Sequence, residues 1–164
     1  KNKDVSSLTA CVLDRPRHKK IIDKLKDLNV NLKLITDGDV LGAIYVSDPK
    51  YNVDMYLGIG GGPEGVLAGS ALDAFDCFFQ GRFIFDNDKD INEAKKMGIT
   101  DLDKKYELNE IIKGDSIFCA TGITSSKILK AIEIKNDTFA SETFVTHKDS
   151  NFKKIVKKTD PISE

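Results

Sequence analysis

Three short apolar runs, each followed by a stretch with helical character, constrain the fold of this chain most strongly. Residues 8–13, 31–36 and 53–59 have the length and composition of strands. Apolar side chains recur at helical spacing in residues 17–28, and residues 40–46 and 66–75 also have helical composition. Strands and helices that alternate with short connections are typical of parallel strands joined by crossover helices. The order therefore predicts an α/β fold with a mainly parallel sheet.

The second half of the sequence predicts an antiparallel C-terminal extension. Three stretches near the end alternate apolar and polar residues with period two, and Asn136-Asp137 and residues 149–151 have the composition of hairpin turns. The expected strands are residues 81–85, 116–120, 129–134, 138–146 and 152–157, and the expected helices are residues 90–97 and 107–112. Residues 1–164 show no repeat or internal linker. We expect them to form a single α/β domain, a layered sandwich of helices and sheets.

The composition argues against several classes of protein. The 25 basic and 26 acidic residues give a net charge of −1, so we expect neither a nucleic-acid partner nor a membrane partner. No apolar run approaches the ~18 residues of a transmembrane helix, and no signal-peptide pattern is present. The three cysteines are far apart and lack the spacing of disulfide or zinc frameworks, which favours a reducing compartment. We therefore expect a cytoplasmic protein.

Polar clusters follow each of the three predicted strands in the first half. Ligands of open α/β sheets bind beyond the carboxyl ends of the strands, so three such clusters in succession favour a binding site over separate helix caps. Arg15 and Arg17 flank Pro16 after the first strand. Guanidinium groups hold phosphate through paired hydrogen bonds. Asp37 and Asp39 flank Gly38 after the second strand, where they could bind a metal, accept hydroxyl groups of a sugar, or cap a helix.

The third cluster is a glycine-rich segment, residues 58–65, with the sequence GIGGGPEG. It matches the dinucleotide pattern GxGxxG, but it follows the third strand rather than the first, and Pro63 lacks one of the amides that would hold a pyrophosphate. Pro63 suits the first helical position, which places Glu64 in the first turn. There the carboxylate either interacts only with the helix dipole or ligates a hard divalent cation. A cation would let an acidic segment and a phosphate share one site.

The two histidines have no partner at the spacing of metal ligands or catalytic triads. We interpret His18 and His147 as ordinary surface or helix-end residues.

Taken together, the stretches LDRPRH, ITDGDV, GIGGGPEGVLAGSAL, QGR and GDSIFCATGIT resemble class II fructose-1,6-bisphosphatase, in this order and over nearly the whole chain. The resemblance implies the fold of the inositol monophosphatases and lithium-sensitive sugar phosphatases, in which layers of helix and sheet alternate. It implies a hydrolase that converts fructose 1,6-bisphosphate to fructose 6-phosphate and phosphate, in gluconeogenesis and glycerol metabolism, with Mn²⁺ or Mg²⁺ as cofactor.

The resemblance also implies roles for individual residues. Glu64 corresponds to a metal ligand, and Gly61 lies where the family's loop contacts substrate. Arg15, Pro16 and Arg17 match a substrate-binding stretch, and Asp37, Gly38 and Asp39 match the turn that meets the sugar; the choice of sugar over metal for this turn comes from the family. No catalytic residue is expected in this part of the enzyme.

The family's full chain is about twice this length, so we expect these residues to be the carboxy-terminal half. The amino-terminal half, which supplies most metal ligands and a threonine that helps position the attacking water, is then a partner, together with the sugar bisphosphate and further copies in a homo-oligomer. Three alternatives stay open: a non-catalytic sugar-phosphate-binding or regulatory module, a phosphatase for a related sugar such as sedoheptulose 1,7-bisphosphate, and a nucleotide-dependent α/β enzyme.

Overall fold

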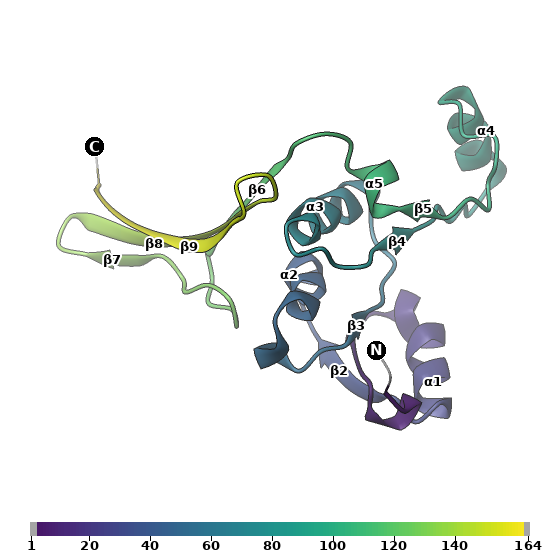
Figure 1. Cartoon of the computed structure of the whole chain (residues 1–164), viewed down its shortest axis with the longest axis horizontal. Helices are drawn as coiled ribbons and strands as arrows, with labels where there is room; N and C mark the ends of the chain where they lie inside the picture. Colours follow the sequence, from purple (N-terminus) through teal and green to yellow (C-terminus); the bar gives the residue numbers. More distant parts are fainter. Residues whose placement is uncertain (1–2, 163–164) are drawn as a thin grey trace.

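The computed structural model describes residues 3–162 and has the predicted α/β architecture (Figure 1). The strands are β1 (Thr9–Leu13), β2 (Asn31–Ile35), β3 (Met55–Tyr56), β4 (Gln80–Gly81), β5 (Tyr106–Glu107), β6 (Ile117–Thr121), β7 (Glu133–Lys135), β8 (Thr138–His147) and β9 (Phe152–Pro161). The α-helices are α1 (Lys19–Asp27), α2 (Asp39–Ile44), α3 (Gly62–Asp73), α4 (Asp88–Lys96) and α5 (Leu108–Ile111). Short 3₁₀ turns span Val5–Ser7, Pro16–His18, Tyr45–Ser47 and Pro49–Tyr51.

Sheet A is parallel, with the strand order β2-β1-β3, and has helices on both faces. Ala10 and Val12 of the central strand point to one face and pack in a cluster with Ile22 of α1. Cys11 points to the other face and packs in a cluster with Ile44 of α2. A strand covered on both faces must be apolar where it is buried, which is why residues 10–13 form an unbroken apolar run. The predicted parallel sheet with crossover helices is confirmed.

Helix α3 lies between α2 and a second, antiparallel sheet. On one side, Ala68 and Leu72 pack against Ala43 of α2, where small side chains let the two helices approach closely. On the other side, Ala71 is fully buried in the cluster that holds Phe118 and Phe144 of the antiparallel sheet. The layers therefore follow one another as α1, sheet A, the α2–α3 layer, and the antiparallel sheet.

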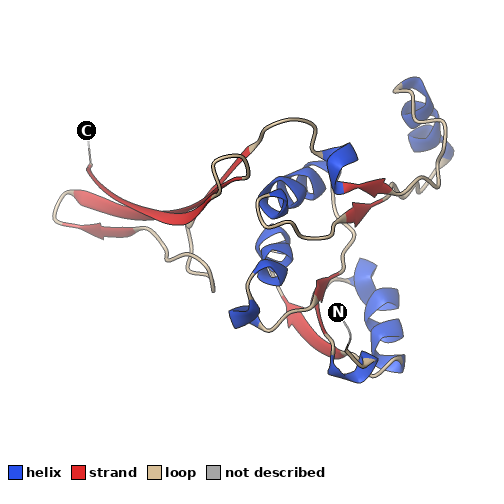
Figure 2. Ribbon diagram, viewed as in Figure 1, coloured by secondary structure: helices blue, strands red, loops and turns tan. Residues whose placement is uncertain are grey.

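This antiparallel sheet, sheet C, forms the predicted C-terminal extension and projects from the body of the molecule (Figure 2). Strand β8 pairs with β9 along one edge and with β6 and β7 along the other. Asn136 and Asp137 both have positive φ angles, 48° and 58°, as a two-residue type I′ hairpin requires. Asn151 also has a positive φ, of 51°, in the second turn. Both predicted hairpin turns are confirmed.

Several predicted strand boundaries were wrong. Of the strand expected at residues 53–59, only β3 forms a regular strand, because the glycines that follow leave the sheet to form the loop before α3. The strand expected at residues 81–85 is reduced to β4, since its partner β5, which we did not predict, is only two residues long. The strand expected at residues 129–134 begins only at Glu133, in β7. Leu129 is buried ahead of it in a turn, where the Ser126 hydroxyl accepts a hydrogen bond from its backbone amide.

Among residues 3–162, no helix combines the length and the apolar composition that crossing a bilayer would demand.

Candidate functional site at the carboxyl ends of sheet A

The three polar clusters predicted from the sequence meet at one edge of sheet A. Because β1, β2 and β3 are parallel, their carboxyl ends point the same way. Backbone hydrogen bonds also link the segments that leave these strands to the neighbouring strands. The Asp14 amide donates to the Ile35 carbonyl at 2.7 Å, and the Leu57 amide donates to the Cys11 carbonyl at 3.1 Å. The prediction that the clusters share one edge is therefore confirmed.

The arginine turn, residues 15–17, leaves β1 and runs over this edge. Arg15 has the extended backbone that a following proline favours, with φ −140° and ψ 150°, and Pro16 opens a 3₁₀ turn. The side chain of Arg17 reaches the glycine segment, where its Nε donates to the Ile59 carbonyl at 2.6 Å. Both arginines are exposed, and within residues 3–162 no ion pair joins either of them to a carboxylate. Arg15 Nη1 donates to the Asp14 carbonyl at 3.2 Å, whereas Arg17 contacts the backbone through its Nε.

The acid turn, residues 37–39, is built around a left-handed glycine. Gly38 has φ 76° and ψ 56°, a conformation that glycine adopts without strain. Each aspartate uses one oxygen locally: Asp37 Oδ1 accepts from the Gly38 amide at 2.8 Å, and Asp39 Oδ1 accepts from the Val40 amide at 2.9 Å. Neither side chain caps α2, whose N-cap is Gly38 itself. The two aspartates are therefore not an N-cap pair, although Asp39 satisfies a first-turn amide of α2.

Asp39 also approaches the glycine segment. A Cβ placed on Gly60 would lie 3.7 Å from Asp39 Oδ2, so the backbone and the carboxylate are close neighbours. Tyr56, the last residue of β3, belongs to the same group of side chains. Burial, the Asp39 charge and the Cys11 thiol raise the pKa of Tyr56 to about 12, and the Arg17 charge acts in the opposite direction. The site therefore includes a tyrosine that we did not single out from the sequence.

The glycine segment, residues 58–65, leads into α3 as predicted, with Pro63 near the helix start and Glu64 in the first turn. Glu64 is exposed, and its side chain folds back so that a Cβ built on Gly61 would overlap the carboxylate. Only glycine fits at position 61 while Glu64 keeps this rotamer. Gly61 and Glu64, both predicted site residues, therefore lie in direct contact.

The donor chemistry of Glu64 fits a divalent metal, but one carboxylate does not complete a metal site. An exposed anionic oxygen is a suitable ligand for a hard cation such as Mg²⁺ or Mn²⁺. Among the described residues, however, no group of three or more His, Cys, Asp or Glu side chains lies close enough together to hold a metal ion. Within these residues Glu64 is therefore a single candidate ligand rather than part of a ligand cluster.

Sequence reasoning missed the burial of His18. We expected a surface or helix-end residue; His18 does lie at the start of α1, but its side chain is only 1% exposed. Its Nδ1 lies 2.6 Å from the Leu13 carbonyl, and the Ile59 amide donates to its Nε2 at 2.8 Å. The available signal was its position directly after the arginine turn. His147, in contrast, is partly exposed and pairs with Asp115 at 2.6 Å.

Comparison with known proteins identifies related sequences over nearly the whole chain. Residues 1–160 match a family model described as bacterial fructose-1,6-bisphosphatase, glpX-encoded. A protein of Synechococcus sp. (strain JA-2-3B'a(2-13)) is 32% identical over 168 residues, which cover 94% of this chain and 48% of the relative. A protein of Prochlorococcus marinus (strain NATL1A) is 31% identical over 155 residues, covering 86% of this chain and 46% of the relative.

Both relatives are named D-fructose 1,6-bisphosphatase class 2/sedoheptulose 1,7-bisphosphatase. The chain spans about half the length of the curated relatives it matches.

Proposed function

The chain belongs to the family of bacterial, glpX-encoded fructose-1,6-bisphosphatases, and on that premise we propose that it is the substrate-binding half of a metal-dependent sugar-bisphosphate phosphatase. The observation that carries the proposal is the convergence of an arginine turn, an acid turn and a carboxylate-bearing glycine segment at one edge of sheet A. These three elements provide a receptor for phosphate, acceptors for sugar hydroxyls and a candidate metal ligand.

The arginine turn would hold the phosphate that is not hydrolysed. Arg17 is fixed through its Nε–H bond to the Ile59 carbonyl, which leaves both terminal nitrogens of the guanidinium group for the ligand. Paired N–H donors match the oxygens of a phosphate, and Arg15 adds a second positive charge. Pro16 restricts the backbone between the two arginines, so that less conformational freedom is lost when the anion binds.

The acid turn would bind the sugar. Asp37 and Asp39 each use one carboxylate oxygen on a backbone amide, and the second oxygen can accept a hydrogen bond from a hydroxyl group. Asp39 lies beside Gly60, so a sugar bound there would also contact the glycine segment, where Gly61 was predicted to meet the substrate.

Glu64 would contribute one ligand to a divalent cation, Mn²⁺ or Mg²⁺. When bound, such a cation neutralises phosphoryl oxygens and lowers the pKa of a coordinated water. The proposed reaction is hydrolysis of the 1-phosphate of fructose 1,6-bisphosphate, with water as the second substrate and fructose 6-phosphate and inorganic phosphate as products. Sedoheptulose 1,7-bisphosphate, which the names of the relatives include, would be an alternative sugar bisphosphate for the same reaction.

We propose that the main partner is an amino-terminal half like that of the relatives, and the outer face of sheet C supports this. Strand alternation places Ile117, Cys119 and Thr121 opposite to the buried Phe118, on the face turned away from α3. Ile117 is 66% exposed. The registers bring Val145 and Val156 onto the same face. Lys154 pairs with Val145 and therefore lies on this face too. The solvent face of an antiparallel sheet is normally polar, so exposed apolar side chains such as Ile117 and Val156 suit a further protein layer.

Three further parts of the proposal concern the whole protein. We propose that it works in the cytoplasm, in gluconeogenesis, and as a homo-oligomer. The balanced charge of the chain and its widely separated cysteines are consistent with the first of these.

A non-catalytic sugar-phosphate-binding module is the second candidate. It is favoured by one observation: the described residues hold no cluster of three potential metal ligands. Binding by itself would then be the function of this chain.

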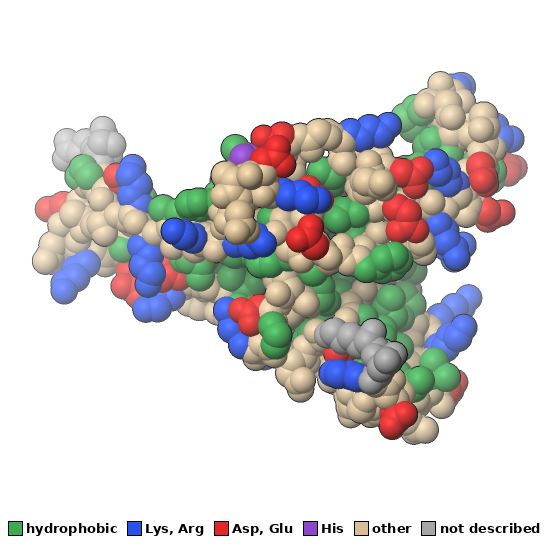
Figure 3. Space-filling view, in the orientation of Figure 1, with side chains coloured by type: hydrophobic (Ala, Val, Ile, Leu, Met, Phe, Trp, Pro, Cys, Tyr) green, Lys and Arg blue, Asp and Glu red, His purple; other side chains and the backbone are tan. Residues whose placement is uncertain are grey.

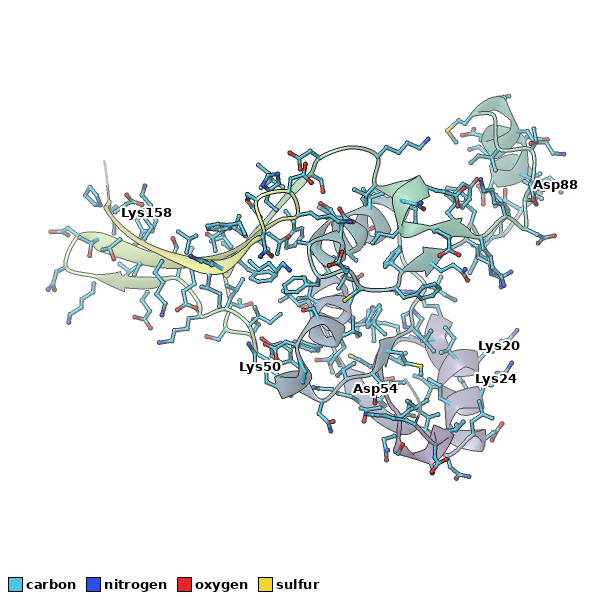
Figure 4. The ribbon with its side chains drawn as sticks, viewed as in Figure 1. Lys20, Lys24, Lys50, Asp54, Asp88 and Lys158 are labelled. Atoms are coloured by element: carbon cyan, nitrogen blue, oxygen red, sulfur yellow. The ribbon has the colours of Figure 1, made fainter. Side chains whose placement is uncertain are left out.

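Calorimetric titration of the chain with fructose 1,6-bisphosphate tests the common part of both candidates. We expect binding, and we expect Arg17→Ala to weaken it by roughly 1.5–3 kcal/mol because a charge-assisted phosphate contact is lost. Lys24→Ala is the matched control, since Lys24 is an exposed cation that points away from the body on α1 (Figure 4). The proposal fails if the unaltered chain does not bind the bisphosphate, or if both substitutions have the same effect.

A further inference from the structure

His18 connects two loops of the site although it contributes no group to the site's surface. Its ring lies between the end of β1 and the glycine segment, where it meets the Leu13 carbonyl at 2.6 Å and the Ile59 amide at 2.8 Å. It is the largest buried side chain among the polar residues of the described chain, with 1% of its surface exposed. A buried polar ring at this position needs a partner for each nitrogen, and the two loops supply them.

The hydrogen bonds define which nitrogen carries the proton. A neutral imidazole has one donor and one acceptor. The Leu13 carbonyl can only accept, so Nδ1 donates to it, and the Ile59 amide can only donate, so Nε2 accepts. The Ile59 carbonyl also lies 2.9 Å from Nε2, but Arg17 Nε donates to that oxygen at 2.6 Å. Both backbone groups of Ile59 are therefore held by side chains from the turn that follows β1.

Ile59 stands directly before the glycines that precede α3, where the backbone has the most conformational freedom. Gly60 lies beside Asp39, and Gly61 carries the Glu64 carboxylate against it. A shift of Ile59 would therefore move the glycine segment relative to both the acid turn and the arginine turn.

We propose that His18 is a positioning residue that holds the glycine segment, and with it Glu64, in a fixed relation to the arginine turn. The inference rests on the proposed function in that the groups so positioned are the phosphate, sugar and metal contacts of a sugar-bisphosphate site. His18 itself touches neither substrate nor metal. It acts through the Ile59 amide, and its bond to Leu13 sets the ring orientation.

Two amide substitutions separate this role from simple filling of space. In His18→Gln, the side-chain oxygen reaches the place of Nε2 and can accept from the Ile59 amide, whereas the donor to Leu13 is lost. In His18→Asn, the shorter side chain can donate to the Leu13 carbonyl in place of Nδ1 but leaves the Ile59 amide without a partner. Both variants remove the ring and lose one of its two bonds, so a side chain that only fills space would destabilise the fold in both, and more in the smaller Asn. Selective exposure of the Ile59 amide in His18→Asn is expected only if His18 holds that amide.

The readouts are hydrogen exchange of the Ile59 amide by NMR and calorimetric binding of fructose 1,6-bisphosphate to the 164-residue chain. We expect His18→Gln to keep Ile59 protected and to bind nearly as the unaltered chain does. We expect His18→Asn to expose the Ile59 amide to exchange and to weaken binding about tenfold, the effect of one lost hydrogen bond. Equal loss of binding in the two variants, or an Ile59 amide equally protected in both, would overturn the proposal.

A measurement on the unaltered chain covers the case in which neither variant folds. The ¹⁵N chemical shifts of the His18 ring distinguish the neutral Nδ1–H form from the Nε2–H form. The hydrogen bonds predict the Nδ1–H form, and an Nε2–H ring, which could not accept from Ile59, would contradict the proposal. Failure of the unaltered chain to bind the bisphosphate would contradict the proposed function instead, while Ile59 exchange and the ring shifts would still test the anchoring.

Discussion

Arg17 shows how one side chain can serve both the fold and the site. Its Nε is bound to the Ile59 carbonyl, so the guanidinium plane is fixed before any ligand arrives. The position of the arginines at the edge of the site could be predicted, because they directly follow a strand in the sequence. The contact of Arg17 with Ile59 could not be predicted, because it joins residues 42 positions apart. For the same reason, the burial of His18 and the inclusion of Tyr56 could not be predicted from local patterns.

At Glu64, a change to glutamine should remove metal binding and leave stability almost unchanged. The carboxylate stabilises α3 only through the helix dipole, an effect of roughly 0.3–1 kcal/mol for such positions, and the amide has the same shape. A neutral oxygen is a much poorer ligand for a hard cation. We expect Mn²⁺ to broaden the NMR signals of residues 61–65 in the unaltered chain and not in Glu64→Gln.

Glu93→Gln is the matched control for this experiment, because Glu93 is an exposed carboxylate on the distant helix α4. Equal broadening at residues 61–65 in the unaltered chain and in Glu64→Gln would mean that Glu64 is no ligand.

Tyr56 should make stability depend on pH in the alkaline range. Its pKa is raised from 10.0 to about 12 in the folded chain, chiefly by burial. As the pH rises through this window, the unfolded chain releases the phenolic proton while the folded chain keeps it, so the free energy of unfolding falls. Denaturant unfolding between pH 10 and pH 12 should show a shallower decline for Tyr56→Phe than for the unaltered chain. Identical slopes would contradict the assigned environment of Tyr56.

Among the elements, strand β1 connects the core to the site. Its alternate residues enter two different clusters, and its carboxyl end carries the arginine turn. The β-α-β-α-β-α order and the two hairpins were predictable because period, length and turn composition are local properties. The lengths of β3, β4 and β7 were not, because a strand extends only as far as its partner can pair with it.

At the amino-terminal end of β1, Asp54→Ala should destabilise the fold by about 1–3 kcal/mol, because a backbone amide of sheet A loses its acceptor. Asp54 Oδ2 accepts from the Thr9 amide at 3.0 Å, and its other oxygen pairs with Lys3 at 2.8 Å. Asp54 lies within the body of the molecule, whereas Asp88 lies on the remote α4 (Figure 4). Chemical denaturation should therefore show a large loss for Asp54→Ala and a small one for Asp88→Ala.

The variant Asp54→Asn should lose less stability than Asp54→Ala, because its side-chain amide oxygen can still accept a hydrogen bond from the Thr9 amide. If Asp54→Ala unfolds at the same denaturant concentration as the unaltered chain, the bond to Thr9 contributes nothing.

For the whole molecule, the arrangement of layers decides what the chain can do alone. Hydrophobic side chains gather in the middle of the face seen in Figure 3, and charged side chains surround them. The sequence predicted a helix-and-sheet sandwich, and the layers from α1 to sheet C agree with it. It did not predict that sheet C would project from the body with Ile117 and Val156 exposed, because strand alternation does not tell which of two faces is covered.

The isolated chain should bind fructose 1,6-bisphosphate without hydrolysing it. Positioning the substrate requires the arginine and acid turns, both of which this chain contains. Metal-assisted hydrolysis requires a cation with a defined set of ligands. The described residues hold no cluster of three potential ligands, so Glu64 would hold the cation without such a cluster.

Release of inorganic phosphate from the bisphosphate in the presence of Mn²⁺ measures turnover, and calorimetry on the same preparation measures binding. We expect the chain to bind the bisphosphate. We expect phosphate to be released no faster than in buffer that contains Mn²⁺ alone. Sustained turnover by the pure 164-residue chain would show that these residues assemble a complete catalytic site, and the division of labour between two halves would have to be abandoned.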